Sequence, residues 1–345
     1  MTATTETRKA LFAGRDWITT QEWTDAELDV MLDVAGDLKR KFKGRVPHRY
    51  LTDQTIFLMF FDKSTRTRNS FEAGMTQLGG HAHFLTADVM QVSHGESAKD
   101  TGIILSRYGH GIAIRHDLIP GEGNAYMREV ARWAAKPVIN MQCDIDHPCQ
   151  TLADLMTIRE KRGNDLRGLK IAVTWAYAPS YAKPLSVPQG LIMLMPRFGM
   201  DVTLAHPPEY SLMPETMQAA HENAERCGGK FRVADNIEDA FRDADVVIPK
   251  SWGCLDTMGA NPAESLRIAR QYTSWICDAA RMKLARPDVL YMHPLPADRG
   301  NEVTDEVIDG PTSVDYDEAE NRLHTAKAIM ALTMADREIE YQTHG

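Results

Sequence analysis

Five consecutive polar residues, Ser64-Thr65-Arg66-Thr67-Arg68, follow the apolar run 54–61 and precede an amphipathic run over 68–78. The first run is typical of a buried strand, and the second has apolar residues at helical spacing. The polar residues therefore lie where a strand turns into a helix, whose first N–H groups are unpaired and partly positive. Hydroxyl and guanidinium groups at such a turn suit a phosphate or a similar dianion.

A simpler interpretation of this turn is that Ser64 or Thr65 caps the helix and that the arginines are solvated. One polar residue would favour that interpretation, whereas five at a single strand end favour an anion site. The turn lacks the Gly-x-x-x-x-Gly-Lys pattern of nucleoside triphosphate loops, so the sequence does not indicate that class of ligand.

The elements that must position this turn alternate between strand and helix along the whole chain. This order predicts an α/β fold with two doubly wound, Rossmann-like parallel sheets. We expect residues 1–148 with 318–345 to form one domain and 149–317 the other. The predicted strands are 54–61, 81–85, 111–115, 137–141, 169–175, 201–205, 245–249 and 289–292. The predicted helices begin near residues 24, 68, 97, 123, 146, 189, 214, 235 and 318.

Ligands of parallel α/β sheets bind at the carboxyl ends of the strands. The polar clusters of this sequence follow predicted strands, so we expect them to converge on one cleft between the domains. A nicotinamide cofactor is not indicated, because no Gly-x-Gly-x-x-Gly follows the strand 169–175. The clusters are 62–68, Arg115, 147–150, 250–253 and 293–299.

Composition limits the classes of function. The chain has 345 residues, a formal net charge of −9 and a mean hydropathy of −0.36. The negative charge argues against a nucleic-acid partner, and no apolar run approaches the length of a membrane span. Five cysteines, an odd number without metal-ligand spacing, favour a reducing cytoplasm.

Several motifs together resemble the aspartate/ornithine transcarbamylase family over nearly the whole chain. The resemblance implies carbamoyl transfer between carbamoyl phosphate and an amine, with no metal and no organic cofactor. It also implies a homotrimer, or a dimer of trimers, with active sites between subunits. The matching motifs are Ser64-Thr65-Arg66-Thr67-Arg68, Arg115, His147-Pro148-Cys149-Gln150, His293-Pro294-Leu295-Pro296 and Glu320-Asn321-Arg322.

The same resemblance implies roles for these residues at the carbamoyl phosphate. Arg115 and His147 would polarise the carbonyl oxygen, with help from Thr67, and these three are the candidate catalytic residues. Gln150 and the backbone carbonyl of Leu295 would hold the carbamoyl NH2 group. The phosphate would be held by Ser64, Thr65, Arg66 and Thr67, and Arg322 completes the candidate carbamoyl phosphate site.

Each of these residues has a plainer interpretation when taken alone. His147 could be a helix-start residue satisfied locally, and Arg115 could form a surface ion pair. The polar loop 86–96 could be a solvated connection; in the family, the equivalent loop reaches a neighbouring subunit's site. We therefore predict that Gln91, Ser93 or His94 contributes in trans.

The second half resembles a sub-branch of knotted transcarbamylases, through Lys183-Pro184-Leu185 and Lys250-Ser251-Trp252-Gly253. The resemblance implies a trefoil knot in the second domain. Lys250 suggests an acceptor that carries a carboxylate, whereas free ornithine is disfavoured. We expect Lys183, Lys250, Ser251, Trp252 and Leu295 to bind the acceptor, although Trp252 could instead be a core residue.

The overall likeness is greatest to the knotted, YgeW-type catabolic branch, which is related to acetylornithine transcarbamylase. It implies a diaminopropionate-type ureido acid as substrate, used in phosphorolysis. Glu302 stands where the acetylornithine enzyme has a functional lysine, which argues against acetylornithine. Two alternatives stay open: an aspartate or N-acylornithine carbamoyltransferase, and a non-catalytic scaffold that binds carbamoyl phosphate. The intact motifs argue against the scaffold.

Overall fold

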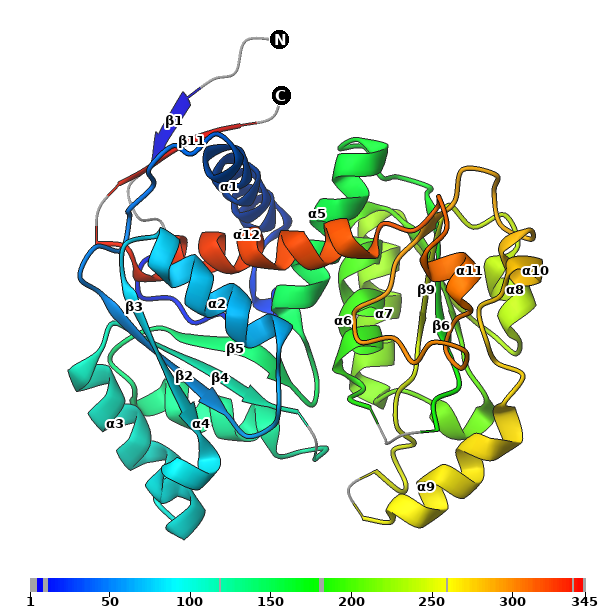
Figure 1. Ribbon diagram of the computed structural model, residues 1–345, viewed down its shortest axis with the longest axis horizontal. Helices are drawn as coiled ribbons and strands as arrows, with labels where there is room; N and C mark the ends of the chain where they lie inside the picture. The colour runs from blue at the N-terminus through cyan, green and yellow to red at the C-terminus, as the bar shows by residue number, and fades with distance from the viewer. Residues whose placement is uncertain are drawn as a thin grey trace.

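The computed structural model describes residues 5–8, 12–117, 119–179, 183–258, 260–336 and 338–343. It contains two parallel sheets, each covered by helices, side by side in the view of Figure 1. This arrangement confirms the predicted α/β fold of two parallel-sheet domains. Among the described residues, no helix combines the length and apolar character needed to cross a membrane.

The first sheet has the strand order β3-β2-β4-β5. Every residue of β2 after Thr55 is buried, because helices cover both faces of the sheet. Phe60 at the end of β2 pairs in register with Arg115 near the end of β4. This register places the turn after β2 beside Arg115. The strands are β2 Thr55–Phe60, β3 His81–Thr86, β4 Gly111–His116 and β5 Val138–Cys143.

The second sheet has the strand order β10-β9-β6-β7-β8. Strand β8 was not predicted, because this edge strand is short and three of its five residues are at least partly exposed, which leaves little apolar pattern. The strands are β6 Lys170–Trp175, β7 Asp201–Ala205, β8 Lys230–Ala234, β9 Val246–Lys250 and β10 Leu290–Tyr291.

Most helices begin near the predicted positions. A capping box begins α1, since Thr24 Oγ1 accepts from Glu27 N at 3.2 Å and Glu27 Oε2 accepts from Thr24 N at 2.8 Å. Helices α9, α10 and α11 were not predicted; all three have eight residues or fewer. The helices are α1 Asp25–Lys43, α2 Arg66–Gln77, α3 Ala98–Tyr108, α4 Gly123–Trp133, α5 Pro148–Arg162, α6 Ser186–Leu194, α7 Pro214–Cys227, α8 Ile237–Phe241, α9 Pro262–Ala269, α10 Ala279–Met282, α11 Asp305–Ile308 and α12 Asp315–Met334.

Helices α5 and α12 connect the two halves of the molecule (Figure 1). They are joined by buried polar contacts: Asn321 Nδ2 of α12 donates to Thr157 Oγ1 of α5 at 2.9 Å. The domain boundaries that we expected at residues 148 and 318 fall at the start of α5 and within α12, so the division stays a prediction. The knot also stays a prediction, because residues 180–182 of the loop that would be threaded lie outside the described residues.

The first and last described strands, β1 Thr5–Arg8 and β11 Ile339–Gln342, form an antiparallel pair of their own. In Figure 1 this pair lies beside α1, at the end of the first half away from the turn after β2. It does not contribute to the site described below.

Candidate active site

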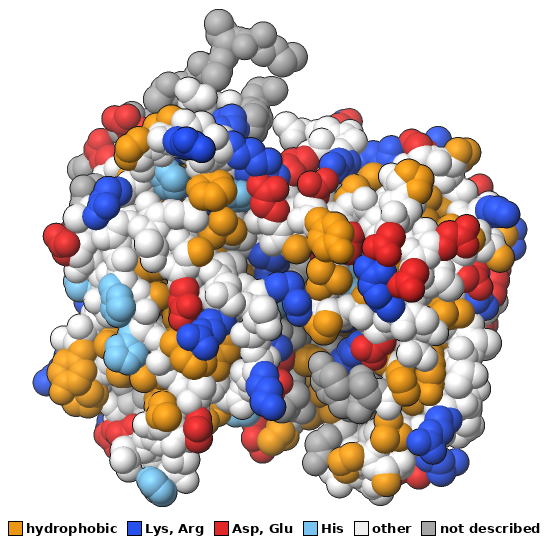
Figure 2. Space-filling model, in the orientation of Figure 1, with side chains coloured by type: hydrophobic (Ala, Val, Ile, Leu, Met, Phe, Trp, Pro, Cys, Tyr) orange, Lys and Arg blue, Asp and Glu red, His pale blue; other side chains and the backbone are white. Residues whose placement is uncertain are grey.

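A cavity of about 230 Å³ lies between the two sheets at the carboxyl ends of their strands. Each of the five predicted polar clusters contributes at least one residue to this cleft. Lys and Arg side chains are visible in the hollow between the two halves (Figure 2). The lining residues are Asp62, Lys63, Ser64, Thr65, Arg66, Thr67, Arg115, Gln142, His147, Gln150, Lys183, Pro184, Val187, Lys250, Pro294, Leu295, Pro296 and Arg322.

The turn after β2 supplies hydroxyl groups to this cleft. Thr65 occupies the N-cap position of α2 but makes no side-chain capping hydrogen bond. Ser64 Oγ accepts from Arg115 Nη1 at 3.3 Å. The simple capping interpretation is therefore wrong for Thr65, and both residues line the cleft with the first N–H groups of α2 nearby.

The two arginines of this turn are separated. Arg66 lines the cleft, whereas the Arg68 guanidinium lies 3.6 Å from the centre of the Phe84 ring. Arg68 Nε also donates to Glu72 Oε1 at 3.1 Å. Two successive steps along a helix rotate a side chain by about 200°, so residues two apart face different directions. Only one guanidinium of the motif is placed for an anion in the cleft.

Arg115 is held in place by a carboxylate that the sequence analysis did not identify. Its Nε and Nη2 donate to Asp117 Oδ1 and Oδ2 at 3.2 and 3.0 Å. Burial raises the pKa of Asp117 to about 6, against the opposing effect of the Arg115 charge. The bidentate contact fixes the plane of the guanidinium and directs Nη1 toward Ser64 and the cleft.

His147 occupies the N-cap position of α5 without a side-chain capping bond. The side chain is 3% exposed, and its Nδ1 has no hydrogen-bond partner among the described residues. Burial, together with Arg322, Arg115 and Arg66, holds its pKa well below the usual value. His147 is therefore a neutral imidazole, able to donate one N–H to a developing oxyanion.

Gln150, Arg322 and Thr67 form one buried network at the back of the cleft. Arg322 Nη2 donates to Thr67 Oγ1 at 2.6 Å, and Nη1 donates to Gln150 Oε1 at 2.5 Å. Burial lowers the pKa of Arg322 to about 10, so the guanidinium stays charged at neutral pH. The network joins α12, α5 and α2 around the proposed carbamoyl site.

Two lysines on the other side of the cleft share one buried carboxylate, Glu302. Lys183 Nζ donates to Glu302 Oε2 at 2.7 Å, and Lys250 Nζ lies 3.4 Å from Glu302 Oε1. Lys250 Nζ also donates to the Pro296 carbonyl at 2.6 Å and lies 3.1 Å from His293 Nε2. Sequence analysis noted Glu302 as a departure from a relative, but not as the partner of these lysines.

Burial and charge set the protonation of this cluster. Burial lowers the pKa of Lys250 to about 8, although the Glu302 charge opposes the shift. Burial and the Lys250 charge lower the pKa of His293 to about 4, so His293 is neutral. Although burial disfavours its charge, Lys250, His293 and Lys183 keep the pKa of Glu302 well below its usual range. At neutral pH the carboxylate is thus ionised between two ammonium groups.

Ser251 and Trp252 do not line the cleft, which corrects the expected acceptor site. They border a separate small cavity with Trp175 and Tyr210. Trp252 is 1% exposed, and its Nε1 donates to the Tyr210 carbonyl at 2.8 Å. The chain leaves strand β9 after Lys250, and the large apolar indole packs into the core where its one polar atom is satisfied.

The three residues expected to act in trans do not line the cleft of their own chain. Gln91, Ser93 and His94 lie on the short 3-10 helix Gln91–His94, which is largely exposed. His94 Nδ1 lies 3.3 Å from Gln91 Oε1, and Ser93 Oγ donates to the Met90 carbonyl at 2.8 Å. Their exposure leaves them accessible, and their contribution to a neighbouring site stays a prediction.

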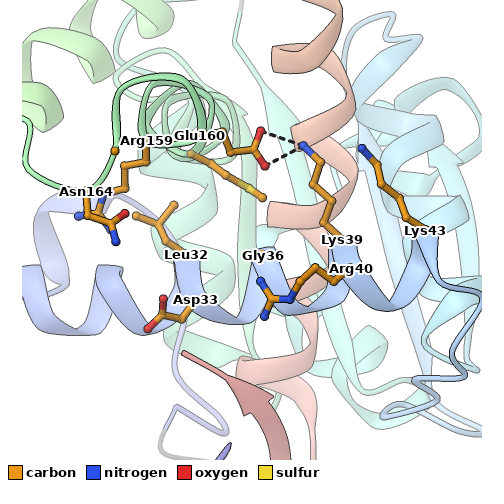
Figure 3. Close-up of a pocket in the computed structure, with 11 residues that line it drawn as sticks. Leu32, Asp33, Gly36, Lys39, Arg40, Lys43, Arg159, Glu160 and Asn164 are labelled. Atoms are coloured by element: carbon orange, nitrogen blue, oxygen red, sulfur yellow. Dashed lines mark hydrogen bonds and ion pairs between the residues drawn. The ribbon is translucent and has the colours of Figure 1, made fainter. Parts of the chain in front are cut away.

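A larger cavity, of about 800 Å³, lies between α1 and α5 (Figure 3). Leu32 and Met156 contribute apolar surface to it, and Lys39 bonds to both carboxylate oxygens of Glu160 at 2.8 Å. None of the residues predicted from the sequence to bind ligand lines this cavity. Although this cavity is larger than the cleft, we therefore do not assign it as the candidate active site.

Fold and cleft together define an α/β protein of two parallel-sheet domains, whose cleft carries hydroxyl and guanidinium groups at the start of α2 on one side and two lysines on the other. Comparison with known protein families matches both halves of the chain. Residues 15–160 match the carbamoyl-P binding domain of aspartate/ornithine carbamoyltransferase, and residues 183–333 match its Asp/Orn binding domain. The chain belongs to the aspartate/ornithine carbamoyltransferase family and is a carbamoyltransferase.

Individual relatives agree with this assignment. The chain is 41% identical over 340 residues to the carbamoyltransferase-like protein YgeW of Escherichia coli K12, covering 88% of this chain and 86% of that protein. It is 39% identical over 322 residues to an ornithine carbamoyltransferase of Thermococcus kodakarensis, covering 93% and 97% of the two chains.

Solved structures show the same fold. Ornithine carbamoyltransferase from Pyrococcus furiosus superposes with a TM-score of 0.84 at 38% identity, covering 94% of this chain and 98% of the other. An acetylornithine transcarbamylase in complex with acetylcitrulline superposes with a TM-score of 0.86 at 35% identity, covering 93% and 100%.

Proposed function

We propose that this carbamoyltransferase moves a carbamoyl group between carbamoyl phosphate and the amine of a small acid that carries a carboxylate. The observation that supports it is the cleft of about 230 Å³, which is lined both by the turn at Ser64–Thr67 and by Lys183 and Lys250. One half of the cleft suits a phosphate dianion, and the other half suits an anionic acceptor.

The proposed chemistry begins with attack of the acceptor amine on the carbonyl carbon of carbamoyl phosphate. A C–N bond forms, the C–O bond to phosphate breaks, the nitrogen loses one proton, and phosphate leaves with the bonding electron pair. Negative charge develops first on the carbonyl oxygen, which neutral His147 and the Arg115 guanidinium stabilise, with help from Thr67. Preorganised donors of this kind contribute about 10²–10³-fold each.

Departure of phosphate requires donors at the turn after β2. Arg66, the Ser64, Thr65 and Thr67 hydroxyls, and the N-terminal N–H groups of α2 hold the leaving group in this proposal. Arg322 contributes indirectly as well, since it donates to Thr67 Oγ1. Gln150 and the Leu295 carbonyl accept from the carbamoyl NH2 group.

The acceptor half favours an anionic group over free ornithine. Lys183 and Lys250 are both buried and both line the cleft. Glu302, 0% exposed and held by these lysines, is not available to an incoming ammonium group. We therefore retain a ureido acid of diaminopropionate type as the proposed substrate, used in the direction of phosphorolysis, which the resemblance to the YgeW-type branch supports.

An aspartate or N-acylornithine carbamoyltransferase is the second candidate. The superposition on an acetylornithine transcarbamylase favours an acylated amino acid, and the two lysines suit aspartate equally well. A non-catalytic scaffold is disfavoured, because the family assignment is to enzymes and the proposed catalytic side chains share one cleft.

The assembly and compartment belong to the same proposal. The exposed 3-10 helix Gln91–His94 supports a homotrimer, or a dimer of trimers, in which it completes a neighbouring site. The five cysteines are unpaired, which supports a reducing cytoplasm.

The experiment that tests the proposal is a phosphate-release assay with carbamoyl phosphate over a panel of acceptors: aspartate, ornithine, N-acetylornithine and 2,3-diaminopropionate. The matching ureido acids are assayed with phosphate for formation of carbamoyl phosphate. Efficient turnover of free ornithine would contradict the proposed acceptor class. No turnover of any acceptor, despite tight carbamoyl phosphate binding, would favour the scaffold.

A further inference from the structure

Two buried carboxyl groups lie behind the cleft and have no role in the mechanism above. Asp154 of α5 is 0% exposed, and Glu318 of α12 is 1% exposed. Neither lines the cleft, yet both contact the same group of Gln150. Gln150 Nε2 donates to Asp154 Oδ1 at 2.7 Å and to Glu318 Oε1 at 2.8 Å.

These contacts fix which end of the Gln150 amide faces the ligand. The NH2 group points to two carboxyl groups, and Oε1 accepts from the Arg322 guanidinium at 2.5 Å. A flipped amide would place its oxygen against two carboxyl oxygens and its NH2 against a guanidinium, so both ends would lose their hydrogen bonds. The orientation in which the NH2 group faces the carboxyl groups and Oε1 faces Arg322, itself a residue of the cleft lining, is therefore enforced from behind.

Glu318 also contacts the other half of the molecule. Its second oxygen, Oε2, accepts from the backbone N–H of His293 at 2.9 Å. His293 begins the segment 293–296, whose other three residues, Pro294, Leu295 and Pro296, line the cleft. One carboxyl group thus touches both elements proposed to supply an acceptor to the carbamoyl NH2: helix α5 and the segment that follows strand β10 of the second sheet.

The pair is compatible with burial because it need not be fully charged. Burial raises the pKa of Asp154 to about 7 and raises the pKa of Glu318 well above its usual value, with the neighbouring carboxyl adding to the shift at Glu318. A pair that retains a proton at neutral pH still accepts from Gln150 Nε2 and from His293 N, without a second buried cation.

We propose that Asp154 and Glu318 are positioning residues that make the site selective for an acyl phosphate bearing an NH2 group, by holding the acceptor oxygens of Gln150 and Leu295 toward it. The proposal rests on the function proposed above, in which the cleft binds carbamoyl phosphate. It predicts discrimination against acetyl phosphate, which has nearly the same shape but presents a methyl group that cannot donate.

The test compares dissociation constants of carbamoyl phosphate, acetyl phosphate and inorganic phosphate by calorimetry on the full-length protein. We expect the wild-type protein to prefer carbamoyl over acetyl phosphate by about 10- to 100-fold, since each acceptor left unpaired weakens binding by roughly tenfold. In Glu318→Gln and Asp154→Asn, a new NH2 group faces Gln150 and permits the amide to flip. Each variant should lose about tenfold of the preference and keep its affinity for inorganic phosphate.

The matched control is Thr157→Val, which removes a buried hydroxyl of α5 that accepts from Asn321 on α12 but does not touch Gln150. It should keep the preference, and thermal melting checks that all variants are folded. If either carboxyl variant fails to fold, the remaining one decides alone. If both fail, Glu318→Asp replaces them; it keeps a carboxyl group but withdraws it by one methylene from Gln150 and His293, and a smaller loss of preference is expected.

The outcomes are distinct. Equal wild-type affinity for carbamoyl and acetyl phosphate would contradict the proposed function itself. A wild-type preference that persists in the carboxyl variants would overturn the positioning role alone. A uniform weakening of all three ligands would also overturn it, because that result describes a general structural role rather than recognition of the NH2 group.

Discussion

The two ends of the cleft differ in how their charges are balanced. At the phosphate end, cations outnumber carboxylates: Lys63, Arg66, Arg115 and Arg322 face Asp62 and Asp117. At the acceptor end, Lys183 and Lys250 are matched by Glu302 and Asp298. The phosphate end can attract an anionic ligand through its net positive charge. At the acceptor end the charges cancel, so an anionic ligand must replace a carboxylate as the partner of Lys183 or Lys250.

The largest effect is expected at the phosphate end. Arg66→Ala should weaken carbamoyl phosphate binding by roughly 10- to 150-fold, because a charge-assisted hydrogen bond contributes about 1.5–3 kcal/mol. Arg68→Ala, two residues along the same helix but stacked on Phe84, is the matched control and should change affinity little. Calorimetry measures the affinity of both variants for carbamoyl phosphate. An unchanged affinity in Arg66→Ala would show that net charge is not the basis of binding at this end.

At the acceptor end, Lys250→Met should raise the acceptor KM by about tenfold, since one of two cations near the acceptor is lost. Carbamoyl phosphate affinity should stay nearly constant, because the two ligands meet different strand ends. The exposed lysine variant Lys283→Met serves as control in steady-state kinetics. Normal acceptor kinetics in Lys250→Met would show that the balanced cluster is structural only.

A subunit-mixing experiment tests whether His94 of a neighbouring subunit contributes to the cleft. Subunits carrying Arg66→Ala are mixed with subunits carrying His94→Ala, after each is shown to be inactive alone. With shared sites, most random trimers are hybrids with one intact site of three, so the mixture should recover about a quarter of wild-type activity. The unmixed variants are the control, and a mixture with no recovered activity would exclude His94 as a contributor in trans.

The pH dependence of acceptor binding should follow Lys250. With a pKa of about 8, Lys250 is charged below that pH and neutral above it. Affinity for a ureido acid without a free amine should therefore be constant below about pH 8 and fall as the pH rises further. Calorimetry against pH measures the effect, and Lys250→Arg should abolish this decline because its guanidinium stays charged. A decline that persists in Lys250→Arg would assign the titration to another group.

The smallest catalytic effect is expected at Trp252. Trp252→Phe removes the hydrogen bond to the buried Tyr210 carbonyl, so the free energy of unfolding should fall by about 1–3 kcal/mol. The acceptor KM should not change, because the indole does not line the cleft. Denaturant unfolding measures the stability and steady-state kinetics measure the acceptor KM. A raised KM with unchanged stability would indicate that Trp252 does bind the acceptor.

The same comparison explains what could be predicted from the sequence. The phosphate end was predicted because Ser64–Thr67 are contiguous and follow a clear strand-to-helix pattern. Even there, the five-residue motif included Arg68, whose guanidinium stacks on Phe84, since a motif does not show which way each helical side chain faces. Asp117 was missed because it stands two residues beyond the predicted strand end, outside every motif.

The acceptor end was harder to predict because its interactions join residues far apart in the chain. Lys183 and Glu302 are separated by 119 positions, and no local pattern links them. Ser251 and Trp252 follow a strand, but the direction of the chain after the strand depends on tertiary packing. The Gln150–Asp154 spacing of four was a signal that could have been used, whereas Glu318 becomes its partner only when α12 packs on α5.

The contacts between α5 and α12 also determine where the molecule can bend. Asn321 and Gln150 tie the two helices together, so they move as one unit. The segment just before α12 is bonded to the second sheet, since Val314 N donates to the Tyr291 carbonyl at 2.9 Å. We therefore expect any opening of the cleft to be concentrated in two short connections, the one after α5 around Gly163 and Gly168 and the one at the start of α12. Amide hydrogen exchange should be fastest in these connections without ligand and slow when both ends of the cleft are occupied.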